Sequence, residues 1–430
     1  MQYVVLAGGK GTRAESNTAK ILSIFEGETL LNRYLRELTK GEILDEQNSI
    51  LFLLGHYSSE IQRLLEAYKE THANLEFFVE DQQLGTYGAI NQAISRLQEE
   101  FIVIMGDLYF DFDFSTFKNY ARTRNASLVA VVHPNGHSFD SDVVELDPTT
   151  NRIQDIQLKG YKNSTKSTLS MAGIYYFNNC LHMFFDKYKV SKDIVEILKE
   201  KFDYHNVPSF GYVTCEFVKD TGTPKRLQEV YSSILADVPK RRSRKGNKGA
   251  IFLDRDNTLL ADPSEKIMLA EDLVEEISTC NKLGVPLIVI TNQPNVAKGK
   301  STIQEVSGFN FTIDSFLEST SCAFIDAWYW CPHHPETGHD EETRVFKVNC
   351  LCRKPGIELF KFAAEDHKIS LKDSYMIGDS IVDFQASKIA KIKFLHTSEF
   401  IPCTINQTHQ CFTSTSAAIK FAREKIDLLC

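Results

Sequence analysis

Short apolar runs alternate with amphipathic segments along most of this chain of 430 residues. Apolar runs predict strands at residues 2–7, 49–55, 75–80, 101–107, 251–253, 287–293 and 375–378. Apolar side chains recur at helical spacing over residues 58–68, and a closing helix is predicted at residues 416–426. Strands that alternate with helices are typical of α/β folds, so we expect an α/β protein.

One basic segment interrupts the pattern. Residues 239–249 hold six basic residues, two glycines and a serine. We interpret residues 236–248 as a flexible linker; a patch for acidic partners is the alternative. The segment divides the chain into two expected domains, residues 1–235 and 249–430.

Composition narrows the class of protein. The chain is 43% hydrophobic, which suffices for two sizeable cores, and its net charge of −9 argues against general nucleic-acid binding. No apolar run approaches the ~18 residues of a membrane span, and the first residues lack a signal-peptide layout. We therefore expect a cytoplasmic enzyme with small-molecule substrates and no membrane partner. The oligomeric state stays open.

A glycine-rich loop follows the first strand. The sequence GGKGTR has glycines that let main-chain N–H groups approach phosphates, and an arginine that matches phosphate charge. Its spacing fits neither the dinucleotide fingerprint nor the P-loop. Lys20 is close enough in the chain to reach the same phosphates. Farther along, Gly85 and Thr86 open a helix near a base or ribose, and Asp107 and Asp220 are candidate Mg²⁺ ligands.

Five stretches in this part, LAGGKGTR, LGTYGA, MGD, MAGIYYF and DTGTP, resemble the sugar nucleotidyltransferase family. The resemblance implies a Rossmann-like, glycosyltransferase-A-like fold and transfer of a nucleotide to a sugar 1-phosphate. It implies that Lys20 steadies phosphates, that Asp107 and Asp220 hold Mg²⁺, that Lys159 and Gly173 contact the sugar phosphate, and that the triphosphate is bound by Gly8, Gly9, Gly11, Thr12 and Arg13. Ala19 and Leu158 depart from the family pattern.

The stretch VVHPNGHSFDSDVVELD resembles the heptose 1-phosphate guanylyltransferase branch of that family. It concentrates four polar residues, His133, His137, Asp140 and Asp142. Two interpretations stay open, a metal site and a polar loop near the substrate.

The second half is organised around IFLDRDNTLL, at residues 251–260. A buried strand there ends in two carboxylates. Beside a divalent cation, Asp254 can attack a phosphoryl group, and Asp256 can protonate the leaving oxygen and later activate water. Other polar groups follow the later strands, namely Thr291, Asn292, Arg353, Lys354 and Asp379. We expect them to meet at the carboxyl ends of the strands, with the hydroxyl, amide and cations around phosphate.

These residues resemble the haloacid dehalogenase superfamily. The resemblance implies a Rossmannoid phosphatase with Mg²⁺ held by Asp254, Asp379 and the main-chain carbonyl of Asp256. Only one predicted helix separates Asp254 from Thr291, which leaves no room for a large cap.

A Cys/His loop precedes Arg353 and Lys354. Cys331, His333, Cys350 and Cys352 form two pairs, as in structural Zn²⁺ sites, with His334 and His339 as rival ligands. The loop, residues 331–352, followed by Arg-Lys-Pro resembles heptose bisphosphate phosphatases and their histidinol phosphatase relatives.

Both resemblances together imply a bifunctional enzyme of nucleotide-activated heptose synthesis. It would remove the 7-phosphate of D-glycero-D-manno-heptose 1,7-bisphosphate and join the heptose 1-phosphate to GTP, with Mg²⁺ and Zn²⁺ as cofactors. Two alternatives remain. One keeps both reactions on mannose or another hexose phosphate, and the other is a histidinol-phosphatase type of activity under a front domain that senses nucleotide sugars.

Overall fold

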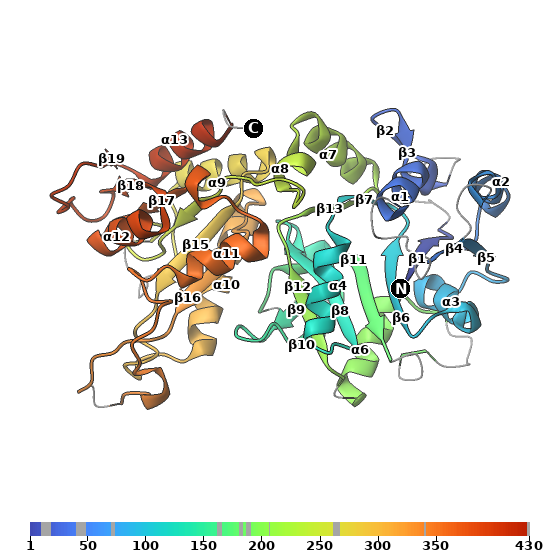
Figure 1. Ribbon diagram of the computed structural model, residues 1–430, viewed down its shortest axis with the longest axis horizontal. Coiled ribbons are helices and arrows are strands. Elements are labelled where there is room, and N and C mark those ends of the chain that lie inside the picture. The colour runs from blue at the N-terminus through green and yellow to red at the C-terminus, as the bar shows by residue number, and fades with distance from the viewer. Residues whose placement is uncertain are drawn as a thin grey trace.

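The computed structural model describes residues 1–9, 19–39, 49–69, 74–160, 166–179, 184–185, 191–205, 207–260, 267–338 and 341–427. Two large sheets form the centres of its two halves (Figure 1), and two sheets of two strands each accompany the first. Among these residues, no helix is both long and apolar enough to cross a membrane.

The front half is a mixed sheet of nine strands in the order β10-β9-β11-β6-β1-β4-β5, with β8 and β12 paired beside β11. β1, β4, β5 and β6 run parallel, whereas β11 runs antiparallel to β6. The strands of this half are β1 (Gln2–Ala7), β2 (Ile24–Phe25), β3 (Glu28–Thr29), β4 (Ser49–Leu54), β5 (Leu75–Val79), β6 (Glu100–Met105), β7 (Leu108–Asp111), β8 (Leu128–Pro134), β9 (Val143–Leu146), β10 (Ile153–Gln157), β11 (Leu169–Asn178), β12 (Ser209–Val213) and β13 (Phe217–Asp220). The helices are α1 (Leu30–Thr39), α2 (Ser58–Lys69), α3 (Gly85–Gln92), α4 (Phe114–Thr123), α6 (Ile194–His205), α7 (Pro224–Leu235) and α8 (Val238–Arg242).

The back half is a parallel sheet of six strands in the order β16-β15-β14-β17-β18-β19. Its strands are β14 (Ile251–Leu253), β15 (Leu287–Asn292), β16 (Ala327–Cys331), β17 (Tyr375–Gly378), β18 (Lys393–Thr397) and β19 (Gln410–Phe412). Its helices are α9 (Glu271–Leu283), α10 (Ile303–Ser321), α11 (Glu358–His367), α12 (Ile381–Ala390) and α13 (Thr415–Asp427). The direction of winding reverses between β14 and β17, and open α/β sheets bind ligands at such a switch point.

Strand alternation explains why each sheet has a core on both faces. In β1, Tyr3 and Val5 face one core while Val4 and Leu6 face the other. In β14, Ile251 packs on the side of α9, α10 and α13, and Phe252 on the side of α11 and α12. The α/β fold with two sheets predicted from the apolar runs is confirmed.

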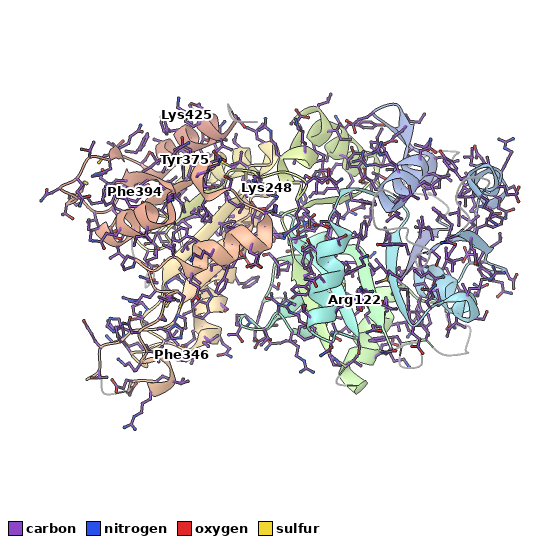
Figure 2. All side chains as sticks on the ribbon, viewed as in Figure 1. Arg122, Lys248, Phe346, Tyr375, Phe394 and Lys425 are labelled. Carbon is purple, nitrogen blue, oxygen red and sulfur yellow. The ribbon has the colours of Figure 1, made fainter. Side chains whose placement is uncertain are left out.

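The segment predicted to be a flexible linker contains helix α8 instead, which lies between the two halves (Figure 1). Arg242 is buried there and forms an ion pair with Asp326, and the Lys248 ammonium donates to the Arg242 carbonyl oxygen at 2.6 Å. Figure 2 labels Lys248 where the chain enters the back half. The basic composition of this segment predicted exposed side chains, but the buried carboxylate of Asp326 binds Arg242 and holds the segment in place.

Candidate active sites

Three carboxylates meet at the switch point of the back sheet. Asp254 follows β14 and Asp379 follows β17, while Asp383 lies in the first turn of α12, where Ser380 forms a capping box with it. One oxygen from each carboxylate lies within 4.8 Å of the others. The strand-end prediction therefore brought Asp254 and Asp379 together correctly. It missed Asp383, because the Ser-x-x-Asp pattern in GDSIVDF indicates only the start of a helix.

Lys354 is the cation of this carboxylate cluster. It is buried, and its Nζ lies 3.0 Å from Asp254 Oδ1 and 2.6 Å from Asp383 Oδ1. The amide of Asn292 accepts from the main-chain N–H of Lys354 at 2.9 Å and donates to its carbonyl oxygen at 3.1 Å. Asn292, predicted to hold phosphate, thus positions Lys354 in this structure.

The electrostatics of the cluster favour a divalent cation. Burial raises the pKa of Asp254, which the Lys354 ammonium opposes, and burial followed by the Asp383 charge raises the pKa of Asp379 to about 6. Burial alone would lower the pKa of Lys354, but Asp254 and Asp383 reverse this and raise it. Three carboxylates against one ammonium leave excess negative charge, and oxygen ligands of this kind suit Mg²⁺. The residues present therefore fit the predicted ion.

Asp256 is held beside this cluster by two side chains that sequence reasoning did not single out. Arg255 Nε donates to Asp256 Oδ1 at 2.8 Å, and Gln293 Nε2 donates to Asp256 Oδ2 at 2.8 Å. Gln293 also donates to the Thr291 hydroxyl at 3.1 Å. The guanidinium of Arg255 is itself fixed over the Phe309 ring, 4.8 Å from its centroid. These contacts orient the acid/base candidate and connect it to Thr291.

The predicted zinc ligands lie together. Cys331, His333, Cys350 and Cys352 offer ligand atoms within 4.8 Å of one another, and the Cys352 sulfur lies 3.3 Å from Cys331 and 3.2 Å from Cys350. A tetrahedral ion with Zn–S bonds of ~2.3 Å has sulfur atoms about 3.8 Å apart, so the set fits zinc after a small expansion. His334 is not in this group, and His339 lies outside the described residues. Arg353 donates to the His333 carbonyl oxygen at 3.3 Å, which connects this cluster to the adjacent cations Arg353 and Lys354.

Two adjoining cavities lie at the site of the front half, and the larger one is also lined by residues of α9 and α10 from the back half. The smaller, about 340 Å³, is lined by Gly8, Gly9, Glu80, Gly85 and Thr86 among others. Gly85 has a φ of +76°, and a side chain there would clash with the Lys192 carbonyl oxygen, which explains the glycine at this turn. The remaining predicted phosphate ligands, Gly11, Thr12 and Arg13, lie outside the described residues.

The larger cavity, about 530 Å³, is lined by Lys159, Gly173 and all four polar residues of the predicted polar loop, His133, His137, Asp140 and Asp142. Asp142 accepts from the Lys159 main-chain N–H at 2.8 Å, and burial lowers the pKa of His133 to about 3, so this imidazole is neutral. The four residues are not grouped as metal ligands among the described residues. They therefore line the cavity beside Lys159.

Lys20, Asp107 and Asp220 converge where the cavities meet. Lys20 Nζ lies 2.9 Å from Asp107 Oδ2, and both residues line both cavities. β13 pairs antiparallel with β7, which sets Asp220 opposite Leu108 and so beside Asp107. A Cβ on Gly222 would lie within 3.4 Å of all three side chains, which explains the glycine between them.

Arg226 is a site residue that the sequence did not reveal. Its Nη1 donates to both oxygens of Asp220 at 2.9 Å, and its Nη2 donates to Asp140 at 3.0 Å. The residue lies in the first turn of α7, capped by Thr223, so only the fold brings it to Asp140.

Comparison with known proteins assigns both halves. Residues 2–237 match the nucleotidyl transferase family, and residues 351–397 match a HAD-hydrolase-like family. A D-glycero-beta-D-manno-heptose-1,7-bisphosphate 7-phosphatase of Escherichia coli O6:H1 is 32% identical over 148 residues, 33% of this chain and 75% of the relative. The phosphatase of the same name from Haemophilus ducreyi is 32% identical over 151 residues, 34% of this chain and 80% of the relative.

The chain belongs to the nucleotidyl transferase family and, in its back half, to the heptose bisphosphate phosphatase family. Its front half is a nucleotidyltransferase and its back half a phosphatase of the heptose bisphosphate phosphatase family, so the predicted fusion of two enzymes is confirmed. Among solved structures, HddC from Yersinia pseudotuberculosis is similar with a TM-score of 0.44 and 20% identity, over 54% of this chain and 99% of that one. The D,D-heptose 1.7-bisphosphate phosphatase from B. bronchiseptica, complexed with magnesium and phosphate, has a TM-score of 0.35 and 18% identity, over 41% and 99%.

Proposed function

We propose that this bifunctional enzyme removes the 7-phosphate of D-glycero-D-manno-heptose 1,7-bisphosphate and then joins the heptose 1-phosphate to GTP, releasing pyrophosphate. One observation carries the proposal. A phosphatase of the heptose bisphosphate family and a nucleotidyltransferase share one chain, and each half assembles its own carboxylate and lysine cluster. The product of the first reaction is then the substrate of the second. We also propose the division into domains 1–235 and 249–430.

In the phosphatase, Asp254 attacks the phosphorus of the 7-phosphate, and Asp256 protonates the departing sugar oxygen. Water activated by Asp256 then hydrolyses the aspartyl phosphate. Lys354, Thr291 and Arg353 hold the phosphate oxygens. Mg²⁺, when bound by Asp254, Asp379 and the Asp256 main-chain carbonyl, would neutralise phosphate charge. Zn²⁺ on the Cys331 cluster would keep Arg353 and Lys354 in place.

In the transferase, the sugar phosphate needs no base because it is already ionised. Its oxygen attacks the α-phosphorus of the nucleotide, and pyrophosphate leaves in line. A nucleotide in the smaller cavity and a sugar phosphate in the larger one would meet at Lys20 and Asp107, which line both. Lys20 neutralises the phosphates, while Asp107 and Asp220 suit the Mg²⁺ that accompanies a triphosphate.

Glu80 supports guanine as the base. Its carboxylate lines the smaller cavity beside Gly8. Guanine presents two adjacent N–H donors on its pairing edge, which one carboxylate accepts together, whereas adenine offers a donor and an acceptor. The preference for GTP should therefore fall in Glu80→Gln.

An assay of the full chain tests the proposal. Heptose 1,7-bisphosphate is supplied with each of the four nucleoside triphosphates, while phosphate and pyrophosphate are measured separately. We expect phosphate with every nucleotide and pyrophosphate mainly with GTP. Faster turnover of a hexose bisphosphate, or of histidinol phosphate, would contradict the heptose assignment. Pyrophosphate release at equal rates from all four nucleotides would contradict the choice of base.

A further inference from the structure

A second Cys/His cluster lies at the far edge of the back sheet. His396 in β18 is the register partner of Cys411 in the parallel edge strand β19, and Cys403 and His409 lie in the connection between the two strands. The ligand atoms of these four residues all lie within 4.8 Å of one another. The active-site roles above use none of the four.

Each of the two imidazoles has one ring nitrogen bonded to a main-chain carbonyl oxygen. His396 Nε2 bonds the Asp379 carbonyl oxygen at 3.0 Å, and the buried Nδ1 of His396 has no hydrogen-bond partner among the described residues. His409 Nδ1 bonds the Gln407 carbonyl oxygen at 2.5 Å, which leaves His409 Nε2 facing the sulfurs of Cys403 at 3.2 Å and Cys411 at 3.1 Å. A carbonyl that takes the N–H of an imidazole leaves a lone pair on the other nitrogen, as in metal-binding histidines.

We propose that His396, Cys403, His409 and Cys411 form a second structural zinc site. Two thiolates and two neutral imidazoles are a common tetrahedral zinc set. The unpartnered His396 nitrogen then gains a ligand bond, and a buried polar atom without a partner would otherwise be unfavourable.

Apolar packing covers part of the cluster, while Cys403 and Cys411 themselves are exposed. The Phe384 and Phe394 rings lie 5.8 and 6.0 Å from the His409 ring, so apolar groups cover one side. Phe394 packs against His409 and Phe346 packs against His333, and Figure 2 shows these two phenylalanines well apart, so the two clusters are separate. β19 has only three residues, and in the part of the chain that the structure describes it pairs with β18 alone, so a metal would fix this short edge strand and its connection.

The same geometry connects the proposed zinc to the phosphatase. Because His396 also bonds the main-chain carbonyl of Asp379, metal on its other nitrogen would hold the turn that presents the Asp379 carboxylate.

Zinc content of the full chain tests the proposal. We expect two zinc ions per chain in the wild type, one in Cys403→Ser/Cys411→Ser and one in Cys350→Ser/Cys352→Ser. Cys322→Ser is the matched control, because Cys322 is exposed and belongs to neither cluster, and it should retain two. The same zinc content in the wild type and in Cys403→Ser/Cys411→Ser would overturn the proposal.

X-ray absorption of the wild type covers the case in which a variant fails to fold. Two occupied sites, one with three sulfurs and one with two, average about 2.5 sulfur neighbours per zinc, whereas the first site alone gives about 3. A Cys403–Cys411 disulfide in the protein as isolated, found by peptide mass analysis without reductant, would also overturn the proposal.

Discussion

The ion pair between Arg242 and Asp326 should hold the segment after α7 against the back half. Only 8% of the Arg242 side chain and 1% of the Asp326 side chain are exposed. Arg242 Nη1 lies 2.5 Å from Asp326 Oδ1 and also donates to the Cys215 carbonyl oxygen of the front half at 3.3 Å. One guanidinium therefore connects both halves of the molecule.

Arg242→Met keeps the apolar stem but leaves the Asp326 carboxylate buried, with the Leu287 N–H at 2.9 Å as its remaining donor. Removing one partner of a buried pair costs about 3–5 kcal/mol, because the other charge stays desolvated. Replacing both partners, in Arg242→Met/Asp326→Asn, should cost less than the sum of the single changes, with a coupling of about 1–3 kcal/mol.

Tryptophan fluorescence in urea reports this directly. The two tryptophans of the chain, Trp328 and Trp330, lie in β16, which begins just after Asp326. At a typical dependence of 1–3 kcal/mol per molar urea, the midpoint for Arg242→Met should fall by about 1 M or more. Lys240→Met is the control, since Lys240 is an exposed basic residue of the same helix. Equal urea midpoints for Arg242→Met and Lys240→Met would refute the stabilising role of the ion pair and would favour a flexible linker.

Two further predictions concern the front half. Burial raises the pKa of Glu216 from 4.5 to about 8, so the folded state binds more protons than the unfolded state between these values and stability falls as the pH rises through them. Glu216→Gln should therefore gain stability relative to the wild type at pH 8 but not at pH 5, by melting temperature; the same difference at both pH values would contradict the buried acid. Asp107→Ala should lower pyrophosphate release at least about 100-fold, because a carboxylate for Mg²⁺ and the partner of Lys20 are both lost. Phosphate release should persist, and normal pyrophosphate turnover would place the metal elsewhere.

Sequence patterns predicted the strands well because buried strands are continuous apolar runs, and acids at their ends stand out. Asp254 and Asp379 were found in this way. Asp383 was missed because it lies in the first turn of α12, where an aspartate is usually only a helix cap.

Contacts between distant segments could not be predicted from the sequence. Arg226 reaches Asp140 only because α7 folds back over the larger cavity. The basic sequence around Arg242 predicted a solvated linker, since the sequence does not indicate that Asp326 lies beside it. The second Cys/His group was overlooked for the same reason. Cys403, His409 and Cys411 are near one another in sequence, but the fourth member, His396, joins them only through the parallel pairing of β18 with β19.

Independence of the two active sites is tested most directly by Asp254→Asn. Given heptose 1,7-bisphosphate and GTP, this variant should release neither phosphate nor pyrophosphate, because the transferase receives no substrate. Given heptose 1-phosphate and GTP, it should release pyrophosphate at the wild-type rate. Equal loss of pyrophosphate release with heptose 1-phosphate would contradict two separate enzymes in one chain.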